Sequence, residues 1–363
     1  MKKLTLLKSM LLLCALIVGS GSVWAVGIYQ KVTSAPSDWS GVYLIVYEGD
    51  GGDHASCALN GATLTDDAEN NGVAVTISDN TIVGSSAIDA AVFVISKSGS
   101  NYKLLAGSGN YIGSTSYANK LIVSSTSMDN TIALDGTNAV ITSNLSGSTT
   151  TLRYNYASNQ NRFRYYKSGQ QAIALYKLTK ERVTITSAGY ATFVSDYALN
   201  YSGISGLTAY SAAVSTNKVS FTTVTTVPAT QGVLLKGEAG NYDVPVIASA
   251  SAITNDFVRG NDAAVPSSAD GKYNFILNKV GGVVAFYAAN GQTVAKNRAY
   301  LQSTTAPGAH GLEMSFDDNT TGIADLKVNT SDVRGEYYNL AGQRIAHPTK
   351  GLYIVNGKKV IMK

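Results

Sequence analysis

Short runs of β-branched and aromatic residues recur roughly every ten positions of this chain, and clusters of Gly, Asn and Ser separate them. Helical periodicity is scarce. This rhythm is typical of β-sandwiches and β-barrels, in which each short strand ends at a turn. The pairs Asn71-Gly72 and Asp135-Gly136 supply residues that tolerate positive φ at such turns. We therefore expect an all-β protein built from tandem β-sandwich or β-barrel-like modules.

The expected strands fall into two groups that meet near residue 180. They are 42–47, 73–77, 92–96, 102–106, 120–123, 139–142 and 172–178, then 183–186, 190–194, 218–224, 232–236, 273–277, 283–287, 299–302 and 312–316. Between them, 247–268 is less regular and is expected to form a long loop or a short helix. The expected organisation is a signal peptide over 1–25, β modules over 26–180 and 181–318, and a linker with a small C-terminal β-hairpin module over 319–363.

The first 25 residues resemble an export leader. Lys2 and Lys3 precede a mainly apolar run, and Val23-Trp24-Ala25 is a small-x-small pattern that a signal peptidase can cut after Ala25. The apolar run is shorter than the roughly 20 residues of a bilayer span. A retained membrane anchor and a lipoprotein anchor at Cys14 are the weaker alternatives. We expect an exported protein, extracellular or associated with the outer surface, without an integral membrane span after cleavage.

The charge balance argues against binding to nucleic acid. The chain has 28 Lys and Arg against 24 Asp and Glu, but three of the lysines belong to the leader. The mature chain is therefore close to neutral, which does not support a polyanion-binding surface. Only 14% of residues are charged, below the roughly 25% of average soluble proteins. Its 22 Tyr and many hydroxyl residues predict a surface wetted by hydroxyls and amides.

An interleaved run of Arg, Tyr and Phe over 152–167 is the most suggestive stretch for binding. It is expected to form a β-hairpin, in which alternate residues point to opposite faces. Tyr rings suit stacking on sugars, and Arg forks donate to hydroxyl or carboxylate oxygens. The alternatives are core packing with Arg stems at the rim, or nucleic-acid stacking. The candidate binding residues are Arg153, Tyr154, Tyr156, Arg162, Arg164, Tyr165 and Tyr166.

No set of residues in the sequence adds up to an active site. Asp66, Asp67 and Glu69 form an acidic cluster that is expected to be solvated, with weak calcium binding as the alternative. The three His are far apart, and Cys57 is alone once the leader is removed, so no intrachain disulfide is expected. We expect no catalytic residues, no metal and no cofactor.

Two parts of the sequence resemble segments of secreted Bacteroidetes proteins. Residues 338–345, followed by Gly351-Leu352-Tyr353-Ile354-Val355 and a basic last strand, are similar to the end of type IX secretion sorting domains. Residues 185–193, 226–237, 282–287 and 299–301 resemble a module that recurs in surface-exposed proteins of that group, and 111–113 with 162–167 resemble an accessory module. The resemblance implies an outer-surface location and a modular build, and it implies no catalytic residues.

The sequence therefore favours a non-catalytic exported or cell-surface protein that adheres to or binds an extracellular glycan or host protein. A glycan hydrolase whose carboxylates meet only in the folded protein is the rival hypothesis. A passive structural or cargo protein without a specific ligand is the third. The sequence does not predict the oligomeric state.

Overall fold

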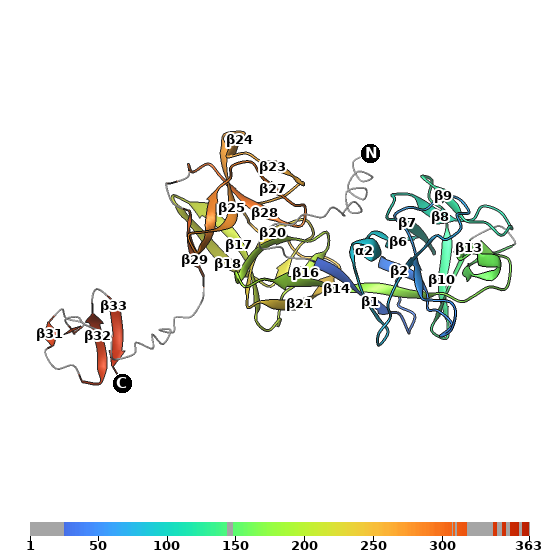
Figure 1. Ribbon diagram of the computed structural model, residues 1–363, viewed down its shortest axis with the longest axis horizontal. Coiled ribbons are helices and arrows are strands. Elements are labelled where there is room, and N and C mark those ends of the chain that lie inside the picture. The colour runs from blue at the N-terminus through green and yellow to red at the C-terminus, as the bar shows by residue number, and fades with distance from the viewer. Residues whose placement is uncertain are drawn as a thin grey trace. The chain divides into compact units, whose positions relative to one another are not determined.

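The computed structural model describes residues 25–143, 148–306, 308, 311–317, 337–339, 343–345, 349–355 and 358–362. The expected leader before Ala25, most of the expected linker and the Asn356-Gly357 turn lie outside these residues. Among the described residues nearly all regular structure is β-strand, which confirms the all-β fold (Figure 1). The described helices are short, and none of them is long and apolar enough to cross a membrane. The described chain divides into two compact units, one ending at Phe316 and one beginning at Asp317.

The N-terminal lobe, residues 25–180 of the first unit, is mainly an antiparallel sheet. Its elements are β1 (Ala25–Lys31), β2 (Gly41–Tyr47), β3 (Cys57–Leu59), β4 (Gly72–Ala74), β5 (Thr81–Val83), α2 (Ser86–Ala90), β6 (Phe93–Ser98), β7 (Asn101–Ala106), β8 (Tyr111–Gly113), β9 (Ile122–Ser124), β10 (Asn130–Asp135), β11 (Asn138–Ser143), β12 (Thr151–Asn155), the 3-10 turn η1 (Ala157–Asn159), β13 (Arg162–Tyr166) and β14 (Ala174–Ile185).

The second lobe, residues 181–316, contains the rest of β14, and its described strands form three further sheets. Its other strands are β15 (Tyr190–Val194), β16 (Ala198–Asn200), β17 (Leu207–Ser215), β18 (Lys218–Val224), β19 (Thr226–Val227), β20 (Gly232–Gly237), β21 (Gly240–Ile247), β22 (Phe257–Arg259), β23 (Ala263–Val265), β24 (Ser268–Ala269), β25 (Lys272–Val280), β26 (Val283–Ala288), β27 (Gln292–Val294), β28 (Ala299–Ser303) and β29 (Glu313–Phe316). The stretch 247–268 holds short strands and loop, so the short helix considered for it does not form.

Two strands of the N-terminal lobe are buried on both faces. On β2, Tyr43 and Ile45 point into one core while Leu44 and Val46 point into another, and all four are fully buried. Alternation along β14 sends its side chains to the same two cores. Because both faces are covered there, β2 and the first three residues of β14 are continuous apolar runs rather than alternating ones.

The strand β14 links the two lobes. Residues 174–177 of β14 pair with β2, and residues 176–183 pair with β1. Residues 180–185 pair with β21 of the second lobe (Figure 1). Twelve residues of strand extend about 40 Å, enough to serve both lobes. Val183 and Ile185 at its end enter the core of the second lobe. The strand runs without a break through residue 180, where the boundary between modules was expected.

The second lobe packs its sheets in layers. The sheet β15-β20-β17-β18-β29 lies between two cores, since Val233 and Leu235 of β20 face one core and Leu234 faces the other. The second of these cores is closed by β25, β26 and β28 through Phe275, Phe286 and Leu301. This is sandwich packing, in which each strand alternates between layers.

The C-terminal unit contains a small antiparallel sheet of its own. Its strands are β30 (Tyr337–Tyr338), β31 (Arg344–Ile345), β32 (Gly351–Val355) and β33 (Lys358–Met362), in the order β31-β30-β32-β33. The longest pairing joins β32 to β33, with Gly351 opposite Met362 and Val355 opposite Lys358. The ring of Tyr337 packs edge-on against that of Tyr353 at 6.2 Å between centroids.

Candidate functional site

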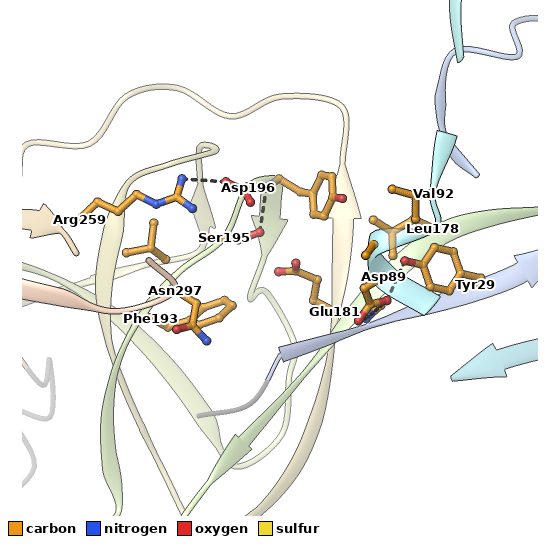
Figure 2. A pocket seen from close by; sticks show the side chains of 14 residues that line it. Tyr29, Asp89, Val92, Leu178, Glu181, Phe193, Ser195, Asp196, Arg259 and Asn297 are labelled. Carbon is orange, nitrogen blue, oxygen red and sulfur yellow. Dashed lines mark hydrogen bonds and ion pairs between the residues drawn. The ribbon is translucent and has the colours of Figure 1, made fainter. Parts of the chain in front are cut away.

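A small cavity of about 90 Å³ lies where β14 passes from the N-terminal lobe to the second lobe. Its walls come from β1, α2 and β14, from the end of β15 with the loop that follows, and from β22. Three carboxylates line it, those of Asp89, Glu181 and Asp196, and they are far apart in sequence (Figure 2). The sequence analysis missed this site, because isolated acids on a helix, a strand and a loop form no motif.

Asp89 is anchored by the first strand of the chain. Its carboxylate accepts the backbone N–H of Gly27 at 3.2 Å and the phenol O–H of Tyr29 at 2.8 Å. Burial raises the pKa of Asp89 to about 6, although the hydrogen bonds from Tyr29 and Gly27 offset part of that rise. Gly27 allows this approach, since a Cβ there would lie 2.7 Å from the ring of Tyr29.

Glu181 is the buried acid at the centre of the cavity. The residue is 9% exposed, and its carboxylate points into the space between the labelled side chains in Figure 2. Its Oε2 atom is fully buried and has no hydrogen-bond partner among the described residues. Burial raises the pKa of Glu181 to about 8, and the negative charges of Asp196 and Asp89 add to the rise, while the Ser195 hydroxyl offsets part of it. A buried charge without a counter-ion is unfavourable, so Glu181 is held mainly protonated near pH 7.

The third acid is already neutralised. Asp196 lies 2.7 Å from the guanidinium of Arg259, whose Nε also donates to the carbonyl of Lys296 at 2.8 Å. Arg259 is the one cationic side chain among the described residues that line the cavity. The cavity therefore has more acidic than cationic side chains, and neither Glu181 nor Asp89 has a cationic partner among the described residues that line it.

The volume and the ligands limit what this cavity can hold. Sites for small organic ligands occupy about 300–1,000 Å³, so a cavity of this size has room for water or for a group as small as an ammonium. Among the residues that the structure describes, no three His, Cys, Asp or Glu side chains are placed to share a metal ion. The arrangement is chemically suited to accept a small cation that donates hydrogen bonds to carboxylates.

The residues that the sequence singled out for binding lie in the other half of the N-terminal lobe. The structure forms the expected hairpin, with β12 paired to β13 and Arg153 opposite Arg164. Tyr154, Tyr165 and Tyr166 are 6%, 0% and 4% exposed, so these rings fill the core or its edge. Tyr154 stacks on Tyr47 at 4.4 Å between centroids. Rings in these positions contribute to packing and offer no face to a ligand.

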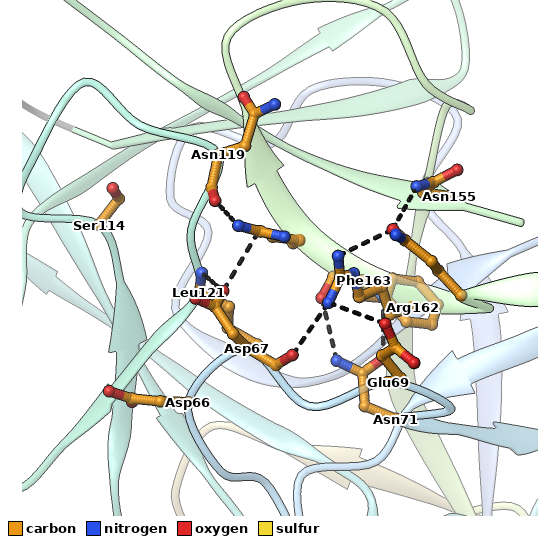
Figure 3. A network of polar contacts seen from close by, with 12 residues as sticks. Asp66, Asp67, Glu69, Asn71, Ser114, Asn119, Leu121, Asn155, Arg162 and Phe163 are labelled. Atoms are coloured by element: carbon orange, nitrogen blue, oxygen red, sulfur yellow. Dashed lines mark hydrogen bonds and ion pairs between the residues drawn. The ribbon is translucent and has the colours of Figure 1, made fainter. Parts of the chain in front are cut away.

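The Arg side chains on the outer face of this hairpin anchor a loop. Arg162 donates to the backbone carbonyl of Asp67 at 3.1 Å and lies 3.6 Å from Glu69, and Arg164 lies 3.2 Å from the Asp67 carboxylate (Figure 3). The Arg162 and Arg164 side chains are only 11% and 19% exposed. Arg153 is half-buried on the same outer face. The structure thus uses these Arg forks to hold residues 66–71 on the sheet.

The acidic cluster has a structural part in the same network. Asp66 accepts the backbone N–H of Val123 at 2.7 Å. Asp67 accepts the backbone N–H of Leu121, also at 2.7 Å (Figure 3). Since Asp67 also pairs with Arg164, it is not the freely solvated acid that was expected. These bonds satisfy two backbone N–H groups, one directly before β9 and one within it.

Two further residues from the sequence analysis are half-buried. Tyr156 stacks on the imidazole of His54 at 3.6 Å between centroids, which pins the loop before β3. Burial raises the pKa of the Cys57 thiol to about 11, so the thiolate is scarce at neutral pH. Neither arrangement brings a base to the thiol.

The exposed aromatic ring near this network is one that the sequence analysis did not select. Tyr117 is 52% exposed in the loop between β8 and β9, and the ammonium of Lys167 lies 5.0 Å from the centre of its ring. Asn119 holds the base of the loop, since its carbonyl oxygen accepts from Arg164 and its side-chain oxygen accepts the backbone N–H of Lys167 at 3.0 Å. The sequence signal was a Tyr that follows Ser114-Thr115-Ser116 and precedes Ala118-Asn119, a segment without large apolar residues beside the ring.

Comparisons with known proteins add no assignment: no family model matches the chain, and no curated protein or solved structure matches it either.

Proposed function

We propose that this chain is a non-catalytic exported protein that binds an extracellular glycan through the loop that carries Tyr117. The observation that carries the proposal is the exposed Tyr117 ring on a firmly held polar loop. An exposed aromatic ring among hydroxyls and amides suits the apolar face and polar rim of a sugar. Because Asn119 already fixes the loop, little conformational entropy is lost when a ligand binds.

Other features support a location outside the cytoplasm. The leader pattern ending at Ala25 and the low content of charged residues are typical of exported proteins. The segment that resembles the end of sorting domains contains the paired strands β32 and β33, and we propose that this unit directs the protein to the outer surface. A host protein is the second class of ligand that the exposed loop could bind.

The cavity revives the rival hypothesis of a carboxylate-based hydrolase only in part. Asp89 and Glu181 are two buried acids with raised pKa values that line one cavity, which is the pairing that glycoside hydrolysis uses. A cavity of about 90 Å³ is too small for a sugar ring with its neighbours. Binding without catalysis is therefore the better supported function.

A glycan array probed with the mature chain tests this proposal, followed by calorimetry on the sugars retained. Tyr117→Ala is expected to weaken binding about tenfold, about 1.4 kcal/mol, whereas Tyr117→Phe retains most of the affinity. Val283→Ser, at a residue that is 61% exposed in the second lobe, is the matched control and is expected to leave binding unchanged. If no glycan on the array is bound, the glycan proposal is refuted and a passive structural protein is favoured. Release of reducing sugar from a glycan would favour the hydrolase.

A further inference from the structure

The Arg259 cation that lines the cavity at β14 is already paired with Asp196, and the start of β1 lies beside the cavity. Gly27 lines the cavity and is opposite Glu181 in the β1–β14 ladder, while Val26 is opposite Arg182 and Ala25 is opposite Val183. One residue of strand advances about 3.3 Å, and paired strands lie about 4.8 Å apart. The backbone nitrogen of Val26 therefore lies on the strand next to β14, one residue from the position opposite Glu181.

We propose that cleavage after Ala25 releases an α-ammonium at Val26 that pairs with the buried Glu181 carboxylate. Hydrolysis of the Ala25–Val26 bond consumes one water, leaves a carboxylate on Ala25 and places the ammonium on Val26. The inference rests on the export leader of the proposed function. It goes further by assigning the partner of the buried acid.

Glu181 is the acid with which this ammonium pairs. Asp89 already accepts hydrogen bonds from Gly27 and Tyr29, and Asp196 is paired with Arg259. Glu181 has a buried oxygen that no described residue bonds, and an ammonium supplies up to three donors. The titratable groups around it are Tyr29 on β1, Asp89 on α2, Asp196 and Tyr197 in the loop after β15, Tyr201 directly after β16, and Arg259 on β22.

The arrangement makes the folded state depend on processing. In the uncleaved chain Val26 has a neutral amide nitrogen, so Glu181 must be buried either protonated or as an uncompensated charge. After cleavage the same carboxylate gains a counter-ion, and the junction between the lobes is stabilised. A precursor that is less stable at this junction than the mature protein is better suited to cross a membrane unfolded.

The decisive experiment compares two forms of the protein with and without Glu181. One form begins at Val26, and the other has a Gly-Ser-Gly-Ser extension before Val26, which leaves a neutral amide there. At pH 7 the extended form is expected to melt about 5 °C or more below the form that begins at Val26. In Glu181→Gln this difference is expected to shrink to about 1 °C. Glu238→Gln, at an exposed acid, is the matched control and is expected to preserve the full difference.

A second readout does not depend on stability. The α-amine of Val26, followed by NMR with labelled valine, is expected to titrate above the ordinary range of about 7.7–8.0 and to return to it in Glu181→Gln. An ordinary α-amine pKa, or equal melting differences with and without Glu181, would overturn the pairing while leaving export intact. Mass spectrometry of the exported protein separates the two proposals: a start at Val26 supports both, and a different start overturns this inference together with the expected cleavage site.

Discussion

The two carboxylate clusters of the first unit differ in whether their acids have partners. In the N-terminal lobe, Asp66 and Asp67 accept backbone N–H groups, and Asp67 also pairs with Arg164 (Figure 3). At the junction of the lobes, Glu181 is more deeply buried, yet its Oε2 has no hydrogen-bond partner within the part of the chain that the structure describes (Figure 2). The hydrogen bonds and ion pair of Asp66 and Asp67 have a structural explanation, since they hold residues 66–71 on the sheet. An unsatisfied buried acid calls for a partner that the described chain does not supply, and this distinguishes a structural network from a candidate site.

The largest effect is expected where the satisfied network reaches the core. Asn71 is 7% exposed, and its side-chain amide bonds both the N–H and the carbonyl of Phe163, at 2.8 and 3.0 Å. Asn71→Ala leaves two buried backbone groups of β13 unpaired and is expected to cost about 3 kcal/mol of unfolding free energy. Urea denaturation measures it. Asn290→Ala, at an exposed turn, is the control and is expected to change stability by less than about 0.5 kcal/mol.

Burial of Glu181 without a cationic partner is expected to make the free energy of unfolding fall as the pH rises. A carboxylate in a salt bridge has the opposite effect. The pKa of Glu181 is raised to about 8 from an ordinary value of 4.5, so the folded state binds a proton that the unfolded state has lost. In the extended form, stability should therefore fall as the pH rises from about 4.5 to about 8. Relative to Glu181→Gln, the loss is expected to be on the order of 2 kcal/mol.

Denaturation at pH 5 and at pH 8.5 measures this difference. A flat profile in the extended form would contradict the burial of an unpaired acid. The form that begins at Val26 should show a smaller fall, because its α-ammonium compensates the charge.

A smaller effect is expected for the paired acid of the satisfied network. Asp67→Asn keeps an oxygen for the N–H of Leu121 but removes the charge that faces Arg164. The expected cost is about 1 kcal/mol at low salt, and less at high salt because the side chain is one-third exposed. Glu69→Gln is the comparison, since Glu69 is 55% exposed and lies 3.6 Å from Arg162. Equal costs for the two variants would show that exposure does not separate them.

The smallest effect on stability is expected at the proposed binding loop. Tyr117→Ala removes a ring that is half exposed, so the free energy of unfolding should change by less than about 0.5 kcal/mol. Thermal unfolding of this variant therefore checks that any lost ligand binding is local. A cost of several kcal/mol would mean that the ring packs against the lobe and does not serve a ligand.

Much of the fold was predictable from the chain itself, whereas the candidate sites were not. Strand and turn residues are local signals, and the expected strands 42–47, 190–194 and 232–236 match β2, β15 and β20 closely. The hairpin of β12 and β13 was also predicted. Which of its faces is buried was left open, because alternation separates two faces without saying which one another layer covers.

The cavity acids show why the rest could not be predicted. Asp89, Glu181 and Asp196 come from a short helix, a strand and a loop, and they meet only because β14 extends from one lobe into the other. A local pattern carries no information about such a meeting. The exposed Tyr117 was missed for a related reason, since the Tyr-rich hairpin looked more suitable until its rings were found in the core.

The sequence by itself determined the all-β class and the positions of most turns, since strand propensity and Gly or Asn at positive φ act within a few residues. The tertiary structure alone decided which aromatic rings face solvent and which acid lies buried without a partner. Burial depends on the packing of strands that are distant in sequence. Burial in turn shifts the pKa of a carboxyl group and decides whether a ligand can contact a side chain.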